Sequence, residues 1–257
     1  MANPKGDFVW YELLTSDTDA AGRFYGDVVG WTVADSGMPG MDYRILDAGD
    51  GQAGGMMELT PEMRDGGARP GWLGYVGVPD VDAAIEDWTG AGGTVRMPAM
   101  DVPGVGRMAM LADPDGVPLY VMRGASDETS TAFRVADPRH VRWNELAARD
   151  DAAALRFYGE RFGWTVAGTM PMGPMGDYSF LAANGTTIGA AMRAQGDTAP
   201  RWLYYFGVED IDAAAAAVSA GGGQVLDGPH EIPGGEFSVH ARDPQGAEFG
   251  LVGPRTA

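Results

Sequence analysis

The sequence contains no cysteine, only three histidines and no long apolar run. The absence of cysteine excludes disulfides, thiolate metal sites and cysteine nucleophiles. No segment reaches the roughly 18 consecutive apolar residues that a membrane-spanning helix requires. Residues 1–7 are polar and lack the apolar stretch of a signal peptide. Together these absences predict a cytoplasmic protein.

Basic residues are also scarce, with 18 Lys and Arg against 36 Asp and Glu, which gives a net charge of −18. Such a chain repels phosphate backbones and anionic lipids, so neither nucleic acid nor a membrane is an expected partner. Glycine, by contrast, is abundant at 40 residues and has no collagen-like period, which indicates many tight turns. Apolar residues make up 45% of the chain, enough to build packed cores.

The two halves of the chain carry the same motifs in the same order. Residues 10–13 (WYEL) recur as 143–146 (WNEL), and residues 23–26 (RFYG) and 30–33 (GWTV) recur at the same offset of 133. Later matches follow at slightly different offsets: Tyr43 with Tyr178, Trp72 with Trp202, and Asp113 with Asp243. So many ordered matches indicate a tandem repeat.

A fainter repeat divides each half again, since the segment that begins at Asp17 resembles the one that begins at Asp80. Asp150 and Asp210 mark the same segments in the second half. The chain therefore reads as four modules, at residues 7–65, 70–124, 138–195 and 200–254. We predict a first domain at 7–124, a linker at 125–137 and a second domain at 138–254. Consecutive modules could pair, or the first could pair with the fourth and the second with the third.

Each module follows one pattern of local signals. A short β-type run such as residues 8–14 comes first, and an aspartate suited to capping a helix N-terminus follows it. The helix ends at glycine, for example Gly30 or Gly163. Three short strands follow, joined by turns such as Asp113-Pro114-Asp115-Gly116. The pattern predicts four βαβββ modules.

These motifs resemble the vicinal oxygen chelate superfamily, which includes glyoxalase I, bleomycin-resistance proteins and extradiol dioxygenases. The resemblance covers all but the termini and the linker, and it is closest to two-domain glyoxalase-like members, among them a mycobacterial antigen or hydroxylase type. It implies an α+β fold, with two tandem domains whose curved mixed sheets enclose cavities. The superfamily includes lyases, isomerases, oxygenases and plain binding proteins, so the fold alone does not define a function.

Metal-dependent members of that superfamily carry ligands in the first and last strands of each module. The resemblance maps these positions to Trp10, Leu73 and Tyr120 in the first half, and to Trp143, Leu203 and Gly250 in the second. None of these supplies the imidazole or carboxylate that such a site requires. We therefore predict no metal site and no cofactor.

Trp10 and Glu12 share one face of the first strand because side chains alternate there, and Trp143 and Glu145 share the equivalent face. The resemblance makes this the cavity face. The remaining residues in cavity register are Tyr75, Tyr120 and Tyr205, so these seven residues are the predicted ligand-binding set.

A carboxylate on an apolar face is costly unless it is paired, which makes Glu12 and Glu145 candidate general bases or hooks for a polar ligand group. The alternative is a structural pairing with an arginine, for which Arg107 and Arg142 are placed by position. His240 is the third catalytic candidate, since it precedes Asp243 in a strand and could point inward.

Three functions are compatible with these residues. We favour a metal-free protein that binds a small, largely apolar or aromatic molecule in its cavities. The alternative is an enzyme of the superfamily, a lyase, isomerase or oxygenase with a non-standard metal site or carboxylate acid–base chemistry. The third is an interaction protein whose cavities are filled. A small molecule is the expected partner, and a homodimer stays open.

Overall fold

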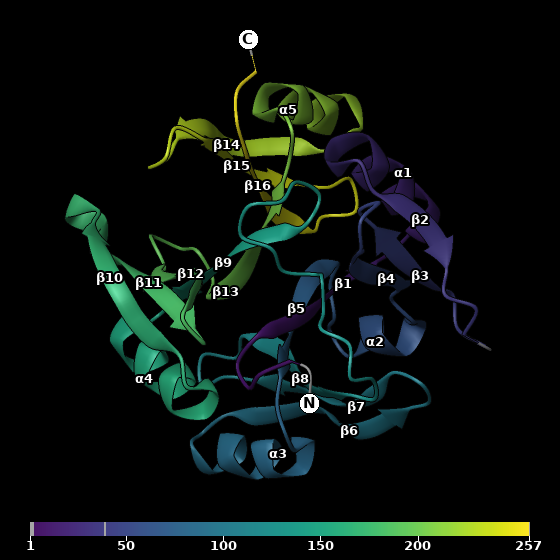
Figure 1. Cartoon of the computed structure of the whole chain (residues 1–257), viewed down its shortest axis with the longest axis vertical. Coiled ribbons are helices and arrows are strands. Elements are labelled where there is room, and N and C mark those ends of the chain that lie inside the picture. Colours follow the sequence, from purple (N-terminus) through teal and green to yellow (C-terminus); the bar gives the residue numbers. More distant parts are fainter. Residues whose placement is uncertain (1–2, 39, 257) are drawn as a thin grey trace. The chain divides into compact units, whose positions relative to one another are not determined.

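The computed structural model, which describes residues 3–38 and 40–256, contains four repeats of one βαβββ motif (Figure 1). The first module comprises β1 (Phe8–Thr15), α1 (Thr18–Val29), β2 (Thr32–Asp35), β3 (Tyr43–Asp47) and β4 (Gln52–Glu58). The second comprises β5 (Gly71–Gly77), α3 (Val81–Gly90), β6 (Thr94–Val102), β7 (Gly106–Ala112) and β8 (Pro118–Gly124). A short helix, α2 (Pro61–Asp65), precedes it.

The second half repeats this order. The third module comprises β9 (Val141–Ala148), α4 (Asp151–Phe162), β10 (Thr165–Pro171), β11 (Asp177–Ala183) and β12 (Thr186–Arg193), with the 3-10 turn η1 (Gly173–Met175) between β10 and β11. The fourth comprises β13 (Arg201–Gly207), α5 (Ile211–Ala220), β14 (Gln224–Glu231), β15 (Phe237–Arg242) and β16 (Glu248–Gly253). The prediction of four βαβββ modules is confirmed.

The strands form two eight-stranded mixed sheets. Their orders are β2-β3-β4-β1-β5-β8-β7-β6 and β10-β11-β12-β9-β13-β16-β15-β14. Within a module the first strand runs parallel to the last, as where Glu12 of β1 faces Gly55 of β4. The hairpins that complete each module are antiparallel. The α+β fold with mixed sheets is therefore also confirmed.

The helix boundaries follow the local signals in the sequence. Each predicted capping aspartate accepts a hydrogen bond from a backbone N–H in the first turn of its helix: Asp17, Asp80, Asp150 and Asp210. Such a bond satisfies a donor that has no partner within the helix. Gly30 and Gly163 end α1 and α4 in the left-handed conformation, with φ of 89° and 78°.

Contacts divide the chain into two compact units that do not follow the sequence order. The first unit contains the residues up to Val9 with Leu73–Ser130 and Trp143–Leu203, and thus most of modules two and three. The second contains Trp10–Trp72, Thr131–Arg142 and the residues from Tyr204 on, and thus modules one and four. Sheets therefore join consecutive modules, whereas the packed cores join the first module to the fourth and the second to the third.

The core of the second unit is built around a buried hydrogen-bond chain. Helix α1 lies beside α5 (Figure 1). The indole N–H of Trp72 donates to the Tyr25 hydroxyl at 2.9 Å, and that hydroxyl donates to Oδ2 of Asp243 at 3.1 Å. Burial raises the pKa of both Asp243 and Tyr25, and the nearby Asp243 carboxylate raises that of Tyr25 further.

The first unit repeats this chain with the equivalent residues. Trp202 donates to the Tyr158 hydroxyl at 3.2 Å, and Tyr158 donates to Oδ2 of Asp113 at 3.0 Å. Asp113 is also buried, and its pKa is raised by desolvation. In the core of each unit, the Phe-Tyr motif therefore contacts an Asp-Pro turn that is distant from it in the sequence.

The segment between the halves packs against the first module. His140 is fully buried, and its Nε2 lies 2.9 Å from Oδ1 of Asp50. Thr131 donates to the carbonyl of Gln52 at 2.9 Å. The part of this connection from Thr131 onwards therefore belongs to the second unit.

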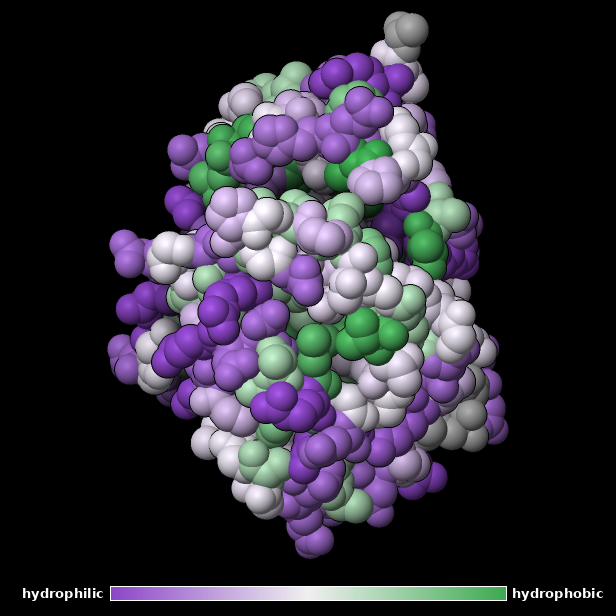
Figure 2. Space-filling view, turned by 90° about the vertical axis from the view of Figure 1, so that its left-hand side faces the viewer, coloured by the Kyte–Doolittle hydropathy of each residue, from purple (hydrophilic) through white to green (hydrophobic). Residues whose placement is uncertain are grey.

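Figure 2 shows one face on which hydrophilic side chains predominate and apolar side chains form small patches. Every helix in the described part of the chain is too short or too polar to cross a lipid bilayer.

Candidate functional site

In the first unit, the predicted residues Trp143 and Glu145 are joined by a tyrosine from a neighbouring hairpin strand. The indole N–H of Trp143 donates to the Tyr178 hydroxyl at 2.8 Å, and that hydroxyl donates to Oε2 of Glu145 at 2.7 Å. Phe180 packs against both aromatic rings, with its centroid 6.1 Å from Trp143 and 5.8 Å from Tyr178. These contacts hold the carboxylate beside an aromatic wall, and Trp143, Tyr178 and Glu145 are all half-buried.

In the second unit, the corresponding tryptophan and tyrosine of the first module form the same hydrogen bond, and Glu12 lies nearby in the sheet. Trp10 donates to the Tyr43 hydroxyl at 2.7 Å. The Tyr43 ring lies over Gly55, where a side chain would collide with the phenol, and Gly55 faces Glu12 across the parallel strands. Glu12 is only 4% exposed, so this carboxyl lies deeper than Glu145.

We call these two sets, residues 10, 43 and 12 and residues 143, 178 and 145, the Trp–Tyr–Glu clusters. Both lie within odd-numbered modules and use equivalent strand positions. Tyr43 and Tyr178 were not among the site residues predicted from the sequence. The signal was present, because both tyrosines belong to the repeat and follow their tryptophans by 33 and 35 residues.

The predicted pair Tyr75 and Tyr120 lies in the first unit, where the two rings stack on each other. Their centroids are 4.1 Å apart with an angle of 11° between the planes, and both are buried. The two residues face each other on the parallel strands β5 and β8. These rings therefore occupy the space above their own strands.

The equivalent positions in the fourth module have a more polar neighbour. Tyr205 lies over Gly250, which replaces the second tyrosine of the stack, and His240 is the neighbour of Gly250 on β15. His240 Nε2 lies 3.1 Å from Oε2 of Glu248, while Oε1 of Glu248 accepts from Arg242 at 2.6 Å. The histidine is thus oriented by a carboxylate that an arginine also holds.

Arg107 and Arg142, which the sequence offered as partners of Glu12 and Glu145, bind other carboxylates. Arg107 pairs with Asp82 and Asp101 at 2.8 Å each, and Arg142 forms a two-pronged pair with Glu236. That expectation was wrong, because strand alternation gives the face of a residue but not its neighbours two strands away. Glu145 instead accepts a hydrogen bond from Tyr178.

The residues at the superfamily's ligand positions do not fit a metal ion. Indole, leucine and glycine side chains at these positions supply no donor, and the one phenol, Tyr120, is stacked on Tyr75. Among the described residues, no three His, Asp or Glu side chains are grouped so as to hold a metal ion.

The fold and the repeated modules identify the class. The chain belongs to the Glyoxalase/Bleomycin resistance protein/Dioxygenase superfamily, whose family model matches residues 7–121 and 129–251. Among its relatives is the protein named "Putative glyoxylase CFP32" of Mycobacterium tuberculosis, 34% identical over 249 residues that cover 95% of this chain and 94% of the relative. The anthracycline biosynthesis protein DnrV of Streptomyces peucetius is 31% identical over 262 residues, covering 95% and 91%.

Solved structures share the fold. The Mn(II)-bound glyoxalase from Novosphingobium aromaticivorans aligns with a TM-score of 0.68 and 17% identity, over 98% of this chain and 83% of that one. The 2,3-dioxygenase LapB from Pseudomonas sp. KL28 aligns with a TM-score of 0.64 and 14% identity, over 100% and 94%. At such low identity these likenesses support the architecture and carry no information on chemistry.

Proposed function

We propose that the chain binds a small, largely apolar or aromatic molecule at its Trp–Tyr–Glu clusters, without a metal. The observation that carries this proposal is the chain of hydrogen bonds from Trp143 through Tyr178 to Glu145. It fixes a flat apolar wall and a charged acceptor side by side, a combination that suits a ring bearing a hydroxyl or N–H group. A relative named for the biosynthesis of anthracyclines, which are polycyclic aromatic compounds, supports this ligand class.

The electrostatics favour a role in binding over a role in stability. A carboxylate next to aromatic rings loses hydration, and hydrogen bonds such as the one from Tyr178 to Glu145 offset part of that loss. Both halves of the repeat nevertheless carry a glutamate at this strand position, Glu12 and Glu145, where an apolar residue would avoid the cost of desolvation. A carboxylate beside an aromatic wall is suited to accept a hydrogen bond from a ligand.

The first test is the binding of hydroxylated aromatic probes, from 2-naphthol to 1,4-dihydroxyanthraquinone, measured by calorimetry on the full chain. We expect Glu145→Gln to raise the Kd of the tightest-binding probe about tenfold, which corresponds to about 1.4 kcal/mol of binding free energy. Tyr178→Phe should have a similar effect, because it removes the hydrogen bond that Tyr178 donates to this carboxylate. Glu160→Gln, on the exposed side of α4, is the matched control and should bind as the parent does.

Two outcomes would overturn this proposal. One is the absence of binding by every probe, which would favour an interaction protein with filled cavities. The other is a stoichiometric transition metal that survives dialysis of the purified protein, which would contradict binding without a metal.

A second candidate function, acid–base catalysis, is supported by the His240–Glu248 pair. A carboxylate that orients an imidazole is a common arrangement for a general base. We expect the protein to accelerate exchange of the α-hydrogen of 2-hydroxyacetophenone in D2O, followed by NMR. His240→Gln should lower the rate by a factor of about 100 or more, and Glu248→Gln by less. Exchange at the buffer rate would exclude this chemistry for such ketones.

A further inference from the structure

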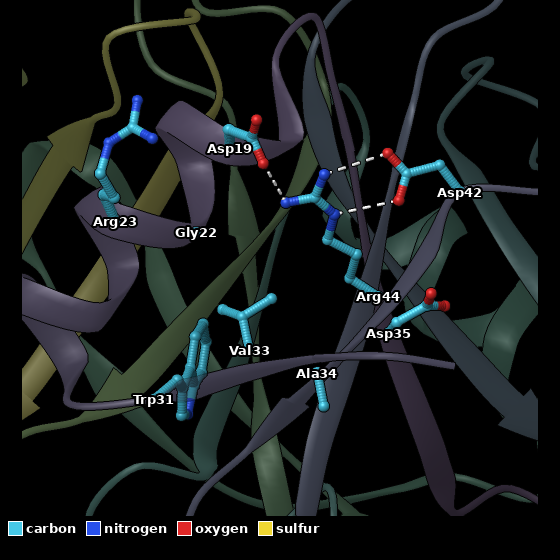
Figure 3. A pocket seen from close by; sticks show the side chains of 9 residues that line it. All are labelled: Asp19, Gly22, Arg23, Trp31, Val33, Ala34, Asp35, Asp42 and Arg44. Carbon is cyan, nitrogen blue, oxygen red and sulfur yellow. Dashed lines mark hydrogen bonds and ion pairs between the residues drawn. The ribbon is translucent and has the colours of Figure 1, made fainter. Parts of the chain in front are cut away.

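A groove of about 520 Å³ lies in the second unit, between helix α1 and the hairpin of β2 and β3 (Figure 3). Its lining consists of Asp19, Gly22, Arg23, Trp31, Val33, Ala34, Asp35, Asp42 and Arg44. None of these residues belongs to the Trp–Tyr–Glu clusters or to the predicted ligand-binding set. The volume falls in the range of small-molecule sites.

Helix α1 passes closely over the hairpin at Gly22, one of the residues that line the groove. A Cβ atom at Gly22 would lie 3.1 Å from Cε of Met56 and 3.3 Å from Cγ2 of Val33, closer than ordinary packing, so the glycine allows this close approach. The repeat places Leu155 at the equivalent position of the second half, 133 residues later. The two halves therefore differ in side-chain bulk at this lining position.

One wall is a guanidinium that its neighbours hold in place. Arg44 donates to Oδ1 and Oδ2 of Asp42 at 3.0 and 3.1 Å and to Asp19 at 2.5 Å, as the dashed lines in Figure 3 show. The hydrogen bonds that Arg44 donates to Asp42 and Asp19 raise the pKa of Arg44, and those to Asp42 lower the pKa of Asp42. The three side chains together carry one negative charge, so Arg44 is not available to attract an anion.

The remaining charges are one carboxylate and one guanidinium at the rim. Asp35 is exposed, and only its Oδ1 is engaged, by the backbone N–H of Gly37 at 2.8 Å. Arg23 is exposed, and in Figure 3 its side chain points away from the apolar floor that Trp31 and Val33 form. Three carboxylates against two guanidiniums leave the groove negative.

We propose that this groove binds a small organic cation, an ammonium group on an apolar body. The body would lie on Val33 and on the small part of Trp31 that is exposed (4%), and the ammonium would pair with Asp35. The net charge of −18 raises the concentration of cations near the whole chain and disfavours anions. Because the ion pair is exposed, the expected affinity is modest, with a Kd of about 1 mM, and should fall as salt rises.

The test compares benzylammonium, benzyl alcohol and benzoate, which share one apolar body and differ in charge. Their binding to the full-length chain is followed by two-dimensional NMR, with the indole N–H signal of Trp31 as the reporter. We expect benzylammonium to bind at least fivefold more tightly than benzyl alcohol, and benzoate to bind least. Equal affinities, tighter binding of benzoate, or no shift with benzylammonium up to 20 times the expected Kd, about 20 mM, would overturn the proposal.

Two variants and one control locate the site. Gly22→Leu should abolish the shift, because it adds a bulky side chain at a position that lines the groove. Asp35→Asn should lower the affinity for benzylammonium about fivefold, because it removes the charge. The amide oxygen can still accept the hydrogen bond from the backbone N–H of Gly37. Asp47→Asn is the matched control, because Asp47 makes the same bond to Gly49 at 2.6 Å and does not line the groove.

An equal effect of Asp35→Asn and Asp47→Asn would contradict the assignment, even if Gly22→Leu failed to fold. Glu145→Gln should leave benzylammonium binding unchanged, so a failure here is distinguishable from a failure of the proposed aromatic site.

Discussion

Tyr25→Phe is expected to lower the free energy of unfolding by about 3 kcal/mol at neutral pH, because it removes the middle of a buried hydrogen-bond chain. Without the hydroxyl, the Trp72 indole loses its acceptor and Oδ2 of Asp243 loses its donor. All three residues are less than 9% exposed, so water cannot replace either bond without rearrangement. A buried polar group without a partner costs about 1–3 kcal/mol.

The loss should depend on pH in a defined direction. Burial raises the pKa of Asp243 in the folded state, and the Tyr25 hydrogen bond opposes that rise. In the variant the folded pKa therefore rises further, whereas the unfolded carboxyl still titrates near 3.9. A raised folded pKa means that stability is lost as pH increases from about 4 through the folded value. The gap between parent and variant should thus widen from pH 4 to pH 7.

Urea denaturation at pH 4.5 and pH 7 measures both effects through the midpoint and the slope. Tyr158→Phe makes the same change in the first unit and should give a similar loss. Asp243→Asn combined with Tyr25→Phe should show no widening, since the titrating group is gone. A loss of unfolding free energy below about 1 kcal/mol, or a loss equal at both pH values, would contradict a structural role for these buried hydrogen bonds.

The sequence predicts those parts of the fold that local chemistry determines. The aspartates before the helices and the glycines after α1 and α4 act through local backbone interactions. The helix ends at Asp17 and Gly30 can therefore be predicted without knowledge of tertiary contacts. The repeat adds the module count, because four copies of one local pattern require four copies of one local structure. The repeat also aligns Trp143 and Glu145 with Trp10 and Glu12, which places them on the equivalent face of their strand.

Contacts between distant modules cannot be read from such patterns. Tyr25 and Asp243 are 218 residues apart, and their hydrogen bond depends on the packing of the first module against the fourth. Both residues occur in repeated motifs, yet nothing local relates the Phe-Tyr pair to the Asp-Pro turn. The sequence therefore left the pairing of modules open, and the structure shows one arrangement for the sheets and another for the cores.

The candidate site shows the same limit at shorter range. Alternation places Glu145 on a face, but Tyr178 reaches it only because β11 lies beyond β12 in the sheet. The groove at Gly22 was missed for a different reason: a glycine within a helix looks like a weak helix former. Only the structure shows that this glycine lines a groove and lets the helix pass closely over Met56.

Gly189→Ala is expected to have the largest effect of the substitutions considered, with a loss of more than about 3 kcal/mol or no recovery of folded protein. A Cβ atom at Gly189 would coincide with the carbonyl oxygen of Asn144 on the adjacent strand β9. That oxygen belongs to the backbone, so no rotamer change can relieve the collision. Asn144 is fully buried, and its side chain donates to the Ile188 carbonyl at 2.6 Å, which holds the two strands together.

The repeat provides an independent check, because Gly54 faces Tyr11 in the first module with the same collision. Gly54→Ala should therefore be as damaging as Gly189→Ala. Gly168→Ala is the control: a Cβ there would lie 3.7 Å from Phe180, an ordinary contact, on a strand of the same sheet. Thermal unfolding of the three variants ranks them directly. If Gly189→Ala unfolded within about 2 °C of Gly168→Ala, β9 and β12 could separate freely, and the close approach that positions Glu145 beside Tyr178 would not be a rigid feature of the sheet.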